Sequence, residues 1–180
     1  MIKINQLPLI VAVIALLITL EAAVAGNTRV VALRGTSTGE IRTSPVPGEI
    51  NNLLCFDVDL IDLKTGNVIG TASDCLDILG MDACEGVKVI GTTVFNFPQG
   101  TLIARGLTSV QPTTHGSLGV THITGAIPEA GENSVLHGTK NFKEASGPVR
   151  LSGAVKMEPD TPSPGDLTIT FDCVFVIELD

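Results

Sequence analysis

Apolar and polar residues alternate along most of the chain beyond residue 26. The alternation is clearest at 167–179, where every odd position is apolar and the even positions include Thr, Asp and Glu. A period of two over such a length predicts a β-strand with one buried face. Residues 149–157 alternate in the same way, and no stretch beyond residue 26 has a convincing helical period. We therefore expect the chain to fold mainly as strands.

Turn residues divide the rest of the chain into stretches of strand length. Gly66 marks a hairpin turn at 63–67, and clusters of proline and glycine at 45–48 and 159–165 mark loops. About eight antiparallel strands in one domain predict an all-β barrel or an all-β sandwich, and the pattern does not choose between them. Further strands are predicted at 28–34, 53–63, 67–73, 87–97, 101–110, 117–127 and 134–138.

The first 25 residues have the pattern of a secretion signal. Lys3 precedes an almost wholly aliphatic run at 9–20, and Ala23-Val24-Ala25 gives the small-x-small pattern of a cleavage site. A membrane-spanning helix needs about 20 apolar residues, so this run of about a dozen is short for one. We expect a cleaved signal helix at 1–25 and one domain at 26–180 that is secreted or periplasmic. An uncleaved membrane anchor is the alternative.

Composition and charge exclude some classes of binding partner for this domain. The chain is 44% hydrophobic and 17% charged, with a formal net charge of −8. Since residues 1–25 carry one Lys and one Glu, the whole net charge belongs to 26–180. The apolar fraction is too high for a disordered chain, and an acidic domain without a basic stripe does not fit nucleic acid or an anionic membrane surface. We expect neither partner.

The four cysteines are expected to form disulfides, because their number is even and the domain is exported. We favour Cys75–Cys84, which closes a short loop, and Cys55–Cys173, which ties an early strand to the last one. Pairing of Cys55 with Cys75 is the alternative, since a bulged turn at 65–66 places them nearly opposite each other across two strands. The cysteines lack C-x-x-C spacing and the histidines lack metal-ligand spacing, so we expect no metal and no cofactor.

Several segments of the second half resemble the dirigent and allene oxide cyclase superfamily. Residues 94–106 (VFNFPQGTLIARG) are similar to its central strand pair. Residues 122–126 (HITGA) and 136–151 are similar to its I-T-G-G and G-T-G-x-F-x-x-A-x-G-x-V-x-L signature, and 173–176 (CVFV) to the closing strand of dirigent proteins. The resemblance implies an eight-stranded antiparallel β-barrel, often a homotrimer, that encloses a small apolar molecule.

Members of this superfamily guide the coupling of phenoxy radicals or the cyclisation of an unsaturated fatty-acid epoxide, mainly by holding a reactive intermediate in one conformation. The resemblance therefore implies an isomerase-like cyclase or a dirigent-like protein with a hydrophobic ligand. The chain has no Tyr and no Trp, so neither residue can line the barrel for a phenolic substrate. This favours an aliphatic or polyketide-like ligand.

Asp57 and Asp59 are candidate catalytic acids. They share a strand face with Cys55, and a bond from Cys55 to Cys173 directs this face into the barrel. Carboxyl groups buried there have raised pKa values and are able to protonate an intermediate. His122, in a predicted strand, is the third catalytic candidate, because histidine titrates near neutral pH. The alternative is that the aspartates face solvent and the histidine is structural.

Arg105 is a candidate ligand contact, because an arginine inside the barrel can bind a carboxylate through two hydrogen bonds. A surface or trimer-interface position is the alternative. Phe56, Phe95 and Phe171 are the candidate apolar contacts. The sequence thus predicts an exported barrel that binds a small hydrophobic molecule and directs its cyclisation or stereoselective coupling by conformational restriction. A non-catalytic carrier and a secreted structural or adhesion β-sandwich are the alternatives, so turnover stays open.

Overall fold

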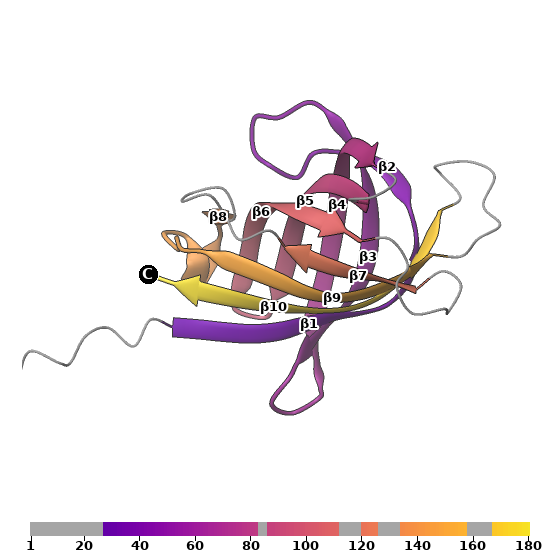
Figure 1. Cartoon of the computed structure of the whole chain (residues 1–180). Helices are drawn as coiled ribbons and strands as arrows, with labels where there is room; N and C mark the ends of the chain where they lie inside the picture. The colour runs from indigo at the N-terminus through magenta and orange to yellow at the C-terminus, as the bar shows by residue number, and fades with distance from the viewer. Residues whose placement is uncertain (1–26, 83–85, 112–119, 126–133, 158–166) are drawn as a thin grey trace, which may run out of the picture.

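The computed structural model describes residues 27–82, 86–111, 120–125, 134–157 and 167–180 (Figure 1). The predicted signal segment at 1–25 lies outside the described residues. None of the described elements is a helix long and apolar enough to cross a membrane. The elements are β1 (Asn27–Thr38), β2 (Glu40–Thr43), β3 (Asn52–Asp62), β4 (Val68–Asp82), β5 (Gly86–Phe97), β6 (Gly100–Val110), β7 (Val120–Gly125), β8 (Ser134–Gly138), the short 3-10 helix η2 (Lys140–Phe142), β9 (Val149–Met157) and β10 (Thr168–Leu179).

Strand pairing closes the sheet into an eight-stranded antiparallel barrel, which confirms the barrel prediction and excludes the sandwich (Figure 1). The hydrogen-bonded order is β1-β10-β9-β7-β6-β5-β4-β3, and β1 also pairs with β3, so the sheet closes on itself. Two short strands extend this circuit: β2 pairs with another part of β3, and β8 pairs with another part of β6. Closure gives every strand of the circuit one face toward the interior and one face away from it.

Alternation along the strands decides which side chains face that interior. In β10 every odd position from Ile169 to Leu179 is buried, as the sequence pattern predicts. In β3 the even positions from Leu54 to Leu60 are buried, whereas Asp57 and Asp59 between them are exposed. Burial of one face of each strand gives the barrel a continuous apolar interior, and this burial is the main favourable contribution to folding.

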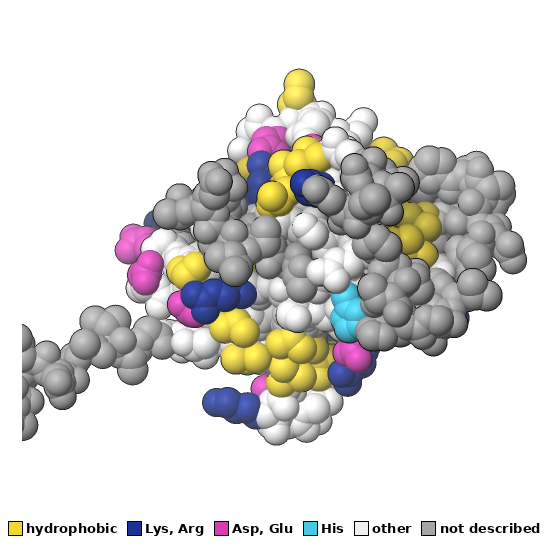
Figure 2. All heavy atoms as spheres, in the orientation of Figure 1, with side chains coloured by type: hydrophobic (Ala, Val, Ile, Leu, Met, Phe, Trp, Pro, Cys, Tyr) yellow, Lys and Arg dark blue, Asp and Glu magenta, His cyan; other side chains and the backbone are white. Residues whose placement is uncertain are grey.

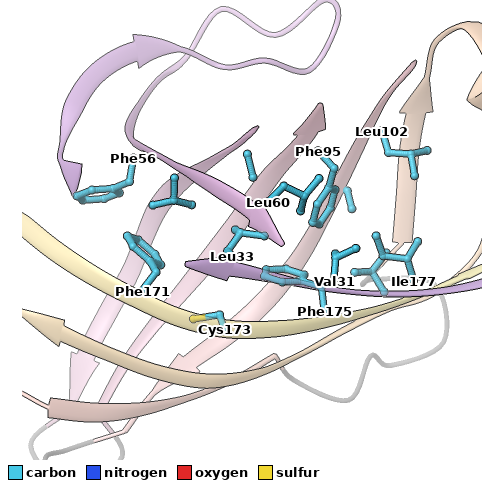
Figure 3. Close-up of a cluster of buried hydrophobic side chains, with 14 of the residues drawn as sticks. Val31, Leu33, Phe56, Leu60, Phe95, Leu102, Phe171, Cys173, Phe175 and Ile177 are labelled. Atoms are coloured by element: carbon cyan, nitrogen blue, oxygen red, sulfur yellow. The ribbon is translucent and has the colours of Figure 1, made fainter. Parts of the chain in front are cut away.

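One part of the interior is packed with phenylalanine rings (Figure 3). Phe95 lies 5.2 Å from Phe175 and 6.2 Å from Phe97, between ring centroids, and Phe97 lies 5.4 Å from Phe142 of η2. Offset and edge-on ring pairs at such distances stabilise beyond the area that they bury. The guanidinium of Arg29 lies 5.2 Å from the ring centre of Phe97 and 4.9 Å from that of Phe142, within cation–π range. This phenylalanine cluster fills the end of the barrel where β1 begins.

A disulfide joins Cys55 to Cys75. The two residues lie directly opposite each other in β3 and β4, with Cα atoms 3.9 Å apart, because the connecting hairpin turns at Gly66, whose φ is 72°. The alternative pairing is therefore confirmed, and the favoured Cys55–Cys173 and Cys75–Cys84 pairings are wrong. Cys173 is a buried free thiol on the inner face of β10, whereas Cys55 faces outward from β3, so the barrel wall separates them. Cys84 lies outside the described residues.

Removal of the disulfide is expected to lower the free energy of unfolding by about 3 kcal/mol, because the bond restricts the unfolded chain. Its two cysteines are 20 residues apart in sequence. We expect this loss in the Cys55→Ala/Cys75→Ala double variant, measured by urea denaturation. Reductant should bring the wild type to the level of the variant and leave the variant unchanged. If reductant does not change the urea midpoint of wild-type unfolding, the Cys55–Cys75 pairing is contradicted.

Candidate functional site

Beyond the phenylalanine cluster, the barrel interior contains a cavity of about 60 Å³. A water-sized group needs about 10–15 Å³ on this measure, so the cavity has room for several such groups. Its wall is formed by six strands, namely β4, β5, β6, β7, β9 and β10. The barrel therefore provides a partly open space that is continuous with its core and able to receive part of a small molecule.

Small residues on two neighbouring strands create this space. Gly91 of β5 lies directly opposite Gly106 of β6, and both line the cavity together with Ala104. Further along the same two strands, Phe95 lies opposite Leu102, and both side chains are fully buried. Both pairs point into the barrel. The cavity exists because glycines occupy one pair, whereas large side chains fill the other.

Three buried polar side chains face this space: Asp74 of β4, Thr93 of β5 and Thr108 of β6. The Thr93 hydroxyl donates a hydrogen bond of 2.7 Å to Asp74 Oδ1. Burial raises the pKa of Asp74 to about 6, although the bond from Thr93 opposes this shift. A carboxyl group that is protonated in mildly acidic solution and faces a cavity can donate a proton or a hydrogen bond to a guest.

The remaining wall of the cavity is mostly apolar. Phe171 and Ile169 of β10 contribute to it together with Met157 of β9, and a mostly apolar wall with a few converging polar groups is typical of small-molecule sites. The predicted ligand contact Phe171 therefore lies at the cavity. Phe56 packs against Phe171, with ring centroids 5.6 Å apart, whereas Phe95 lies in the phenylalanine cluster (Figure 3).

Arg105 lies on the cavity wall, but its guanidinium is held elsewhere. It donates hydrogen bonds of 2.7 and 2.6 Å to the carboxylate of Glu49 and one of 3.0 Å to Thr92. The hydrogen bonds to Glu49 raise the pKa of Arg105, and they lower the pKa of Glu49 to about 2. Thr92 stands between the cavity-lining Gly91 and Thr93, so alternation puts its side chain on the outer face. The guanidinium thus binds Glu49 and holds the loop between β2 and β3 against the outer face of the barrel.

The three predicted catalytic residues lie on the outer face of the barrel. Asp57 accepts hydrogen bonds of 2.9 and 2.6 Å from Arg42, and these bonds lower the pKa of Asp57. Asp59 is exposed on the same face of β3. His122 is exposed on β7, while the next residue, Ile123, lines the cavity. Asp57, Asp59 and His122 are therefore not part of the cavity wall.

Asp74 is the functional candidate that sequence analysis missed. The predicted strand ends at residue 73, and the favoured Cys75–Cys84 bond puts a short loop directly after it. In the structure β4 continues to Asp82. Asp74 then occupies an inward position between Ala72 and Leu76, as a lone acid on an otherwise apolar face. That break in an apolar alternation is the sequence signal that identifies it.

Other classes of site find little support in the described part of the chain. Within it, no group of three or more His, Cys, Asp or Glu side chains is arranged to hold a metal ion. On the face shown in Figure 2, the Lys and Arg side chains drawn in colour lie in separate places instead of one continuous band.

Comparison with known proteins finds no matching family model and no matching curated protein. One similar solved structure is described as a nonspecific heme-binding cyclase that catalyses a (4 + 2) cycloaddition during neoabyssomicin biosynthesis; it is 17% identical, with 98% of this chain and 77% of that chain covered and a TM-score of 0.34. Another is the Diels Alderase AbmU from Streptomyces koyangensis, 16% identical, with 98% and 82% covered and a TM-score of 0.35. Likeness at this level carries no argument about function.

Replacement of Asp74 by Asn is expected to stabilise the protein in a pH-dependent way. The pKa of Asp74 is about 6 in the fold, above its ordinary value of 3.8, so the wild type loses stability as the pH rises from about 4 to about 6. Asn does not ionise, so Asp74→Asn should be more stable by up to about 3 kcal/mol at pH 8 and nearly equal at pH 4. Urea denaturation at both pH values measures this, with the exposed Asp59→Asn as control. A constant difference between variant and wild type at both pH values contradicts the assignment.

Proposed function

We propose that this protein is an exported barrel that binds a small, mainly apolar molecule in its interior cavity and directs the cyclisation or stereoselective coupling of that molecule. The observation that carries the proposal is a barrel packed at one end and hollow beyond it, with one buried carboxyl group in the wall of the hollow. The sequence resemblance of residues 94–106 to dirigent and allene oxide cyclase proteins supports it.

Conformational restriction supplies most of the proposed catalysis. A flexible chain reacts with itself only when its reacting atoms meet, and a rigid wall that holds it folded removes much of this entropic barrier. The closed sheet keeps the wall rigid, since each strand of the circuit is paired on both sides over part of its length. Ring closure by intramolecular addition or cycloaddition is an isomerisation, so it needs no second reactant and releases no leaving group. In the coupling alternative, a separate one-electron oxidant forms the two radicals, and the barrel only orients them.

Asp74 takes the acid role that sequence analysis assigned to Asp57 and Asp59. Its carboxyl group faces the cavity and is held by Thr93, so it has a fixed position relative to a guest. A protonated Asp74 stabilises negative charge that develops on a substrate oxygen during bond formation, and it recovers its proton when the product forms. This contribution adds to conformational restriction and does not need a nucleophile.

Export is the second part of the proposal. The Cys55–Cys75 disulfide supports an oxidising compartment, where such bonds persist. The signal-like residues 1–25 support a secreted or periplasmic location for 26–180. Assembly as a homotrimer stays a prediction from the superfamily resemblance.

A passive carrier is the second candidate function. It is favoured by the small number of reactive groups in the wall, because Asp74 and Arg105 are the ionisable residues of the described lining and the Arg105 guanidinium is bound to Glu49. Burial also raises the pKa of the nearby Cys173 to about 12, so this thiol stays protonated and is a poor nucleophile. Asp74→Asn separates the two functions: a cyclase loses turnover and keeps its guest, whereas a carrier has no turnover to lose.

Filling the cavity at Gly91 is expected to expel the guest. A β-carbon on Gly91 makes only ordinary contacts, so Gly91→Val should fold and occupy cavity space. Native mass spectrometry of protein purified from its own host should find a retained apolar molecule in the wild type and a loss of at least tenfold in Gly91→Val. Gly80→Val is the matched control, because a β-carbon there meets open space. Equal retention by both variants, with unchanged melting temperatures, contradicts binding in this cavity.

A further inference from the structure

A small polar niche lies at Gly91, on the wall of the cavity. A β-carbon built on Gly91 lies 3.7 Å from Thr108 Oγ1, 3.8 Å from Asp74 Oδ1 and 3.9 Å from the backbone oxygen of Gly106. A ligand atom near this point therefore approaches three oxygens at once without displacing any of them. We call this point, bounded by Thr108, Asp74 and Gly106, the Gly91 niche.

The oxygens around the Gly91 niche mainly accept hydrogen bonds. The backbone oxygen of Gly106 can only accept. Asp74 Oδ1 accepts from the Thr93 hydroxyl at 2.7 Å, and its second lone pair can take another donor. The Thr108 hydroxyl both donates and accepts. A ligand group that donates one hydrogen bond and accepts another matches this set, whereas a group that only accepts gives no donor to the Gly106 oxygen or to the second lone pair of Asp74 Oδ1.

The surroundings of the niche favour an uncharged group. A carboxylate finds no free cation on the described wall, because the guanidinium of Arg105 is bound to Glu49 and Thr92. An ammonium ion has to give up its water among apolar side chains such as Met157 and Ile169, and burial of a charge is costly even when it is paired. Burial raises the pKa of Asp74 to about 6, so below that pH the carboxyl is mostly neutral and offers an ammonium ion no opposite charge.

We propose that the natural ligand places a neutral hydroxyl group in the Gly91 niche and lays its apolar remainder against β9 and β10. The ligand class is thus an alcohol, enol or phenol, and it excludes molecules whose single polar group is a ketone, a carboxylate or an amine. This inference rests on the proposed function, because it requires that the cavity binds a guest.

Four probes of similar shape test the inference: benzyl alcohol, benzaldehyde, benzylammonium and toluene. Their dissociation constants are measured by NMR titration at pH 5, where the Asp74 carboxyl is mostly neutral, with the wild type, Thr108→Val, Gly91→Ala and the exposed control Thr36→Val. The wild type should bind benzyl alcohol more tightly than benzaldehyde or benzylammonium. Thr108→Val should reduce the affinity for benzyl alcohol relative to toluene by about three- to tenfold, the net contribution of one hydrogen bond. Gly91→Ala should abolish the preference, and Thr36→Val should leave it unchanged.

Different failures point to different errors. Tightest binding of benzylammonium or benzaldehyde overturns the hydroxyl assignment and leaves the cavity as a binding site. A ratio of alcohol to toluene affinity that is the same in the wild type, Thr108→Val and Gly91→Ala also overturns it, because the niche then does not contact the hydroxyl. Failure of all four probes to bind overturns the proposed function together with this inference.

Discussion

The pairing of β1 with β3 is the constraint on which the rest of the structure depends. It joins the first strand of the circuit to the last, between Val31–Arg34 and Asp59–Asp62, and so turns a sheet into a closed barrel. Closure assigns each residue of these strands to the inside or to the outside of the barrel, whatever the conformation of the connecting loops. The cavity then follows from which side chains occupy inward positions: phenylalanine and leucine fill one part, and Gly91, Ala104 and Gly106 leave another part open.

The outer face supports the wall from behind. The Cys55–Cys75 bond ties β3 to β4 one residue away from Asp74, and the Arg105–Glu49 pair fixes the loop after β2 next to Thr92. These contacts are made by residues of β4, β5 and β6, the strands that carry Asp74, Thr93 and Thr108. A carboxyl group whose burial costs stability keeps its position only where the surrounding strands are held firmly, and Asp74 is such a group.

Much of the fold could be predicted from sequence, because the alternation in β10 reports burial directly, and the superfamily resemblance selects a barrel over a sandwich. The candidate site could not be predicted from sequence, for two physical reasons. Face assignment depends on register: a Cys55–Cys173 bond would turn Asp57 and Asp59 inward, whereas the Gly66 hairpin brings Cys55 opposite Cys75 and leaves both aspartates outside. Long-range pairing also overrides local propensity. It extends β4 through residues 74–82, which include three Asp and one Gly, and only that extension places Asp74 in the interior.

Binding of a guest inside the hollow part of the barrel is the central claim, and methyl-resolved NMR with added toluene tests it most directly. We expect shifts at Ile169 and Met157, which line the cavity, and none at Leu33 and Leu60, which are fully buried away from it. Shifts confined to exposed side chains such as Ile50 and Val68, or no shifts at saturating toluene, would show that the cavity does not bind a guest.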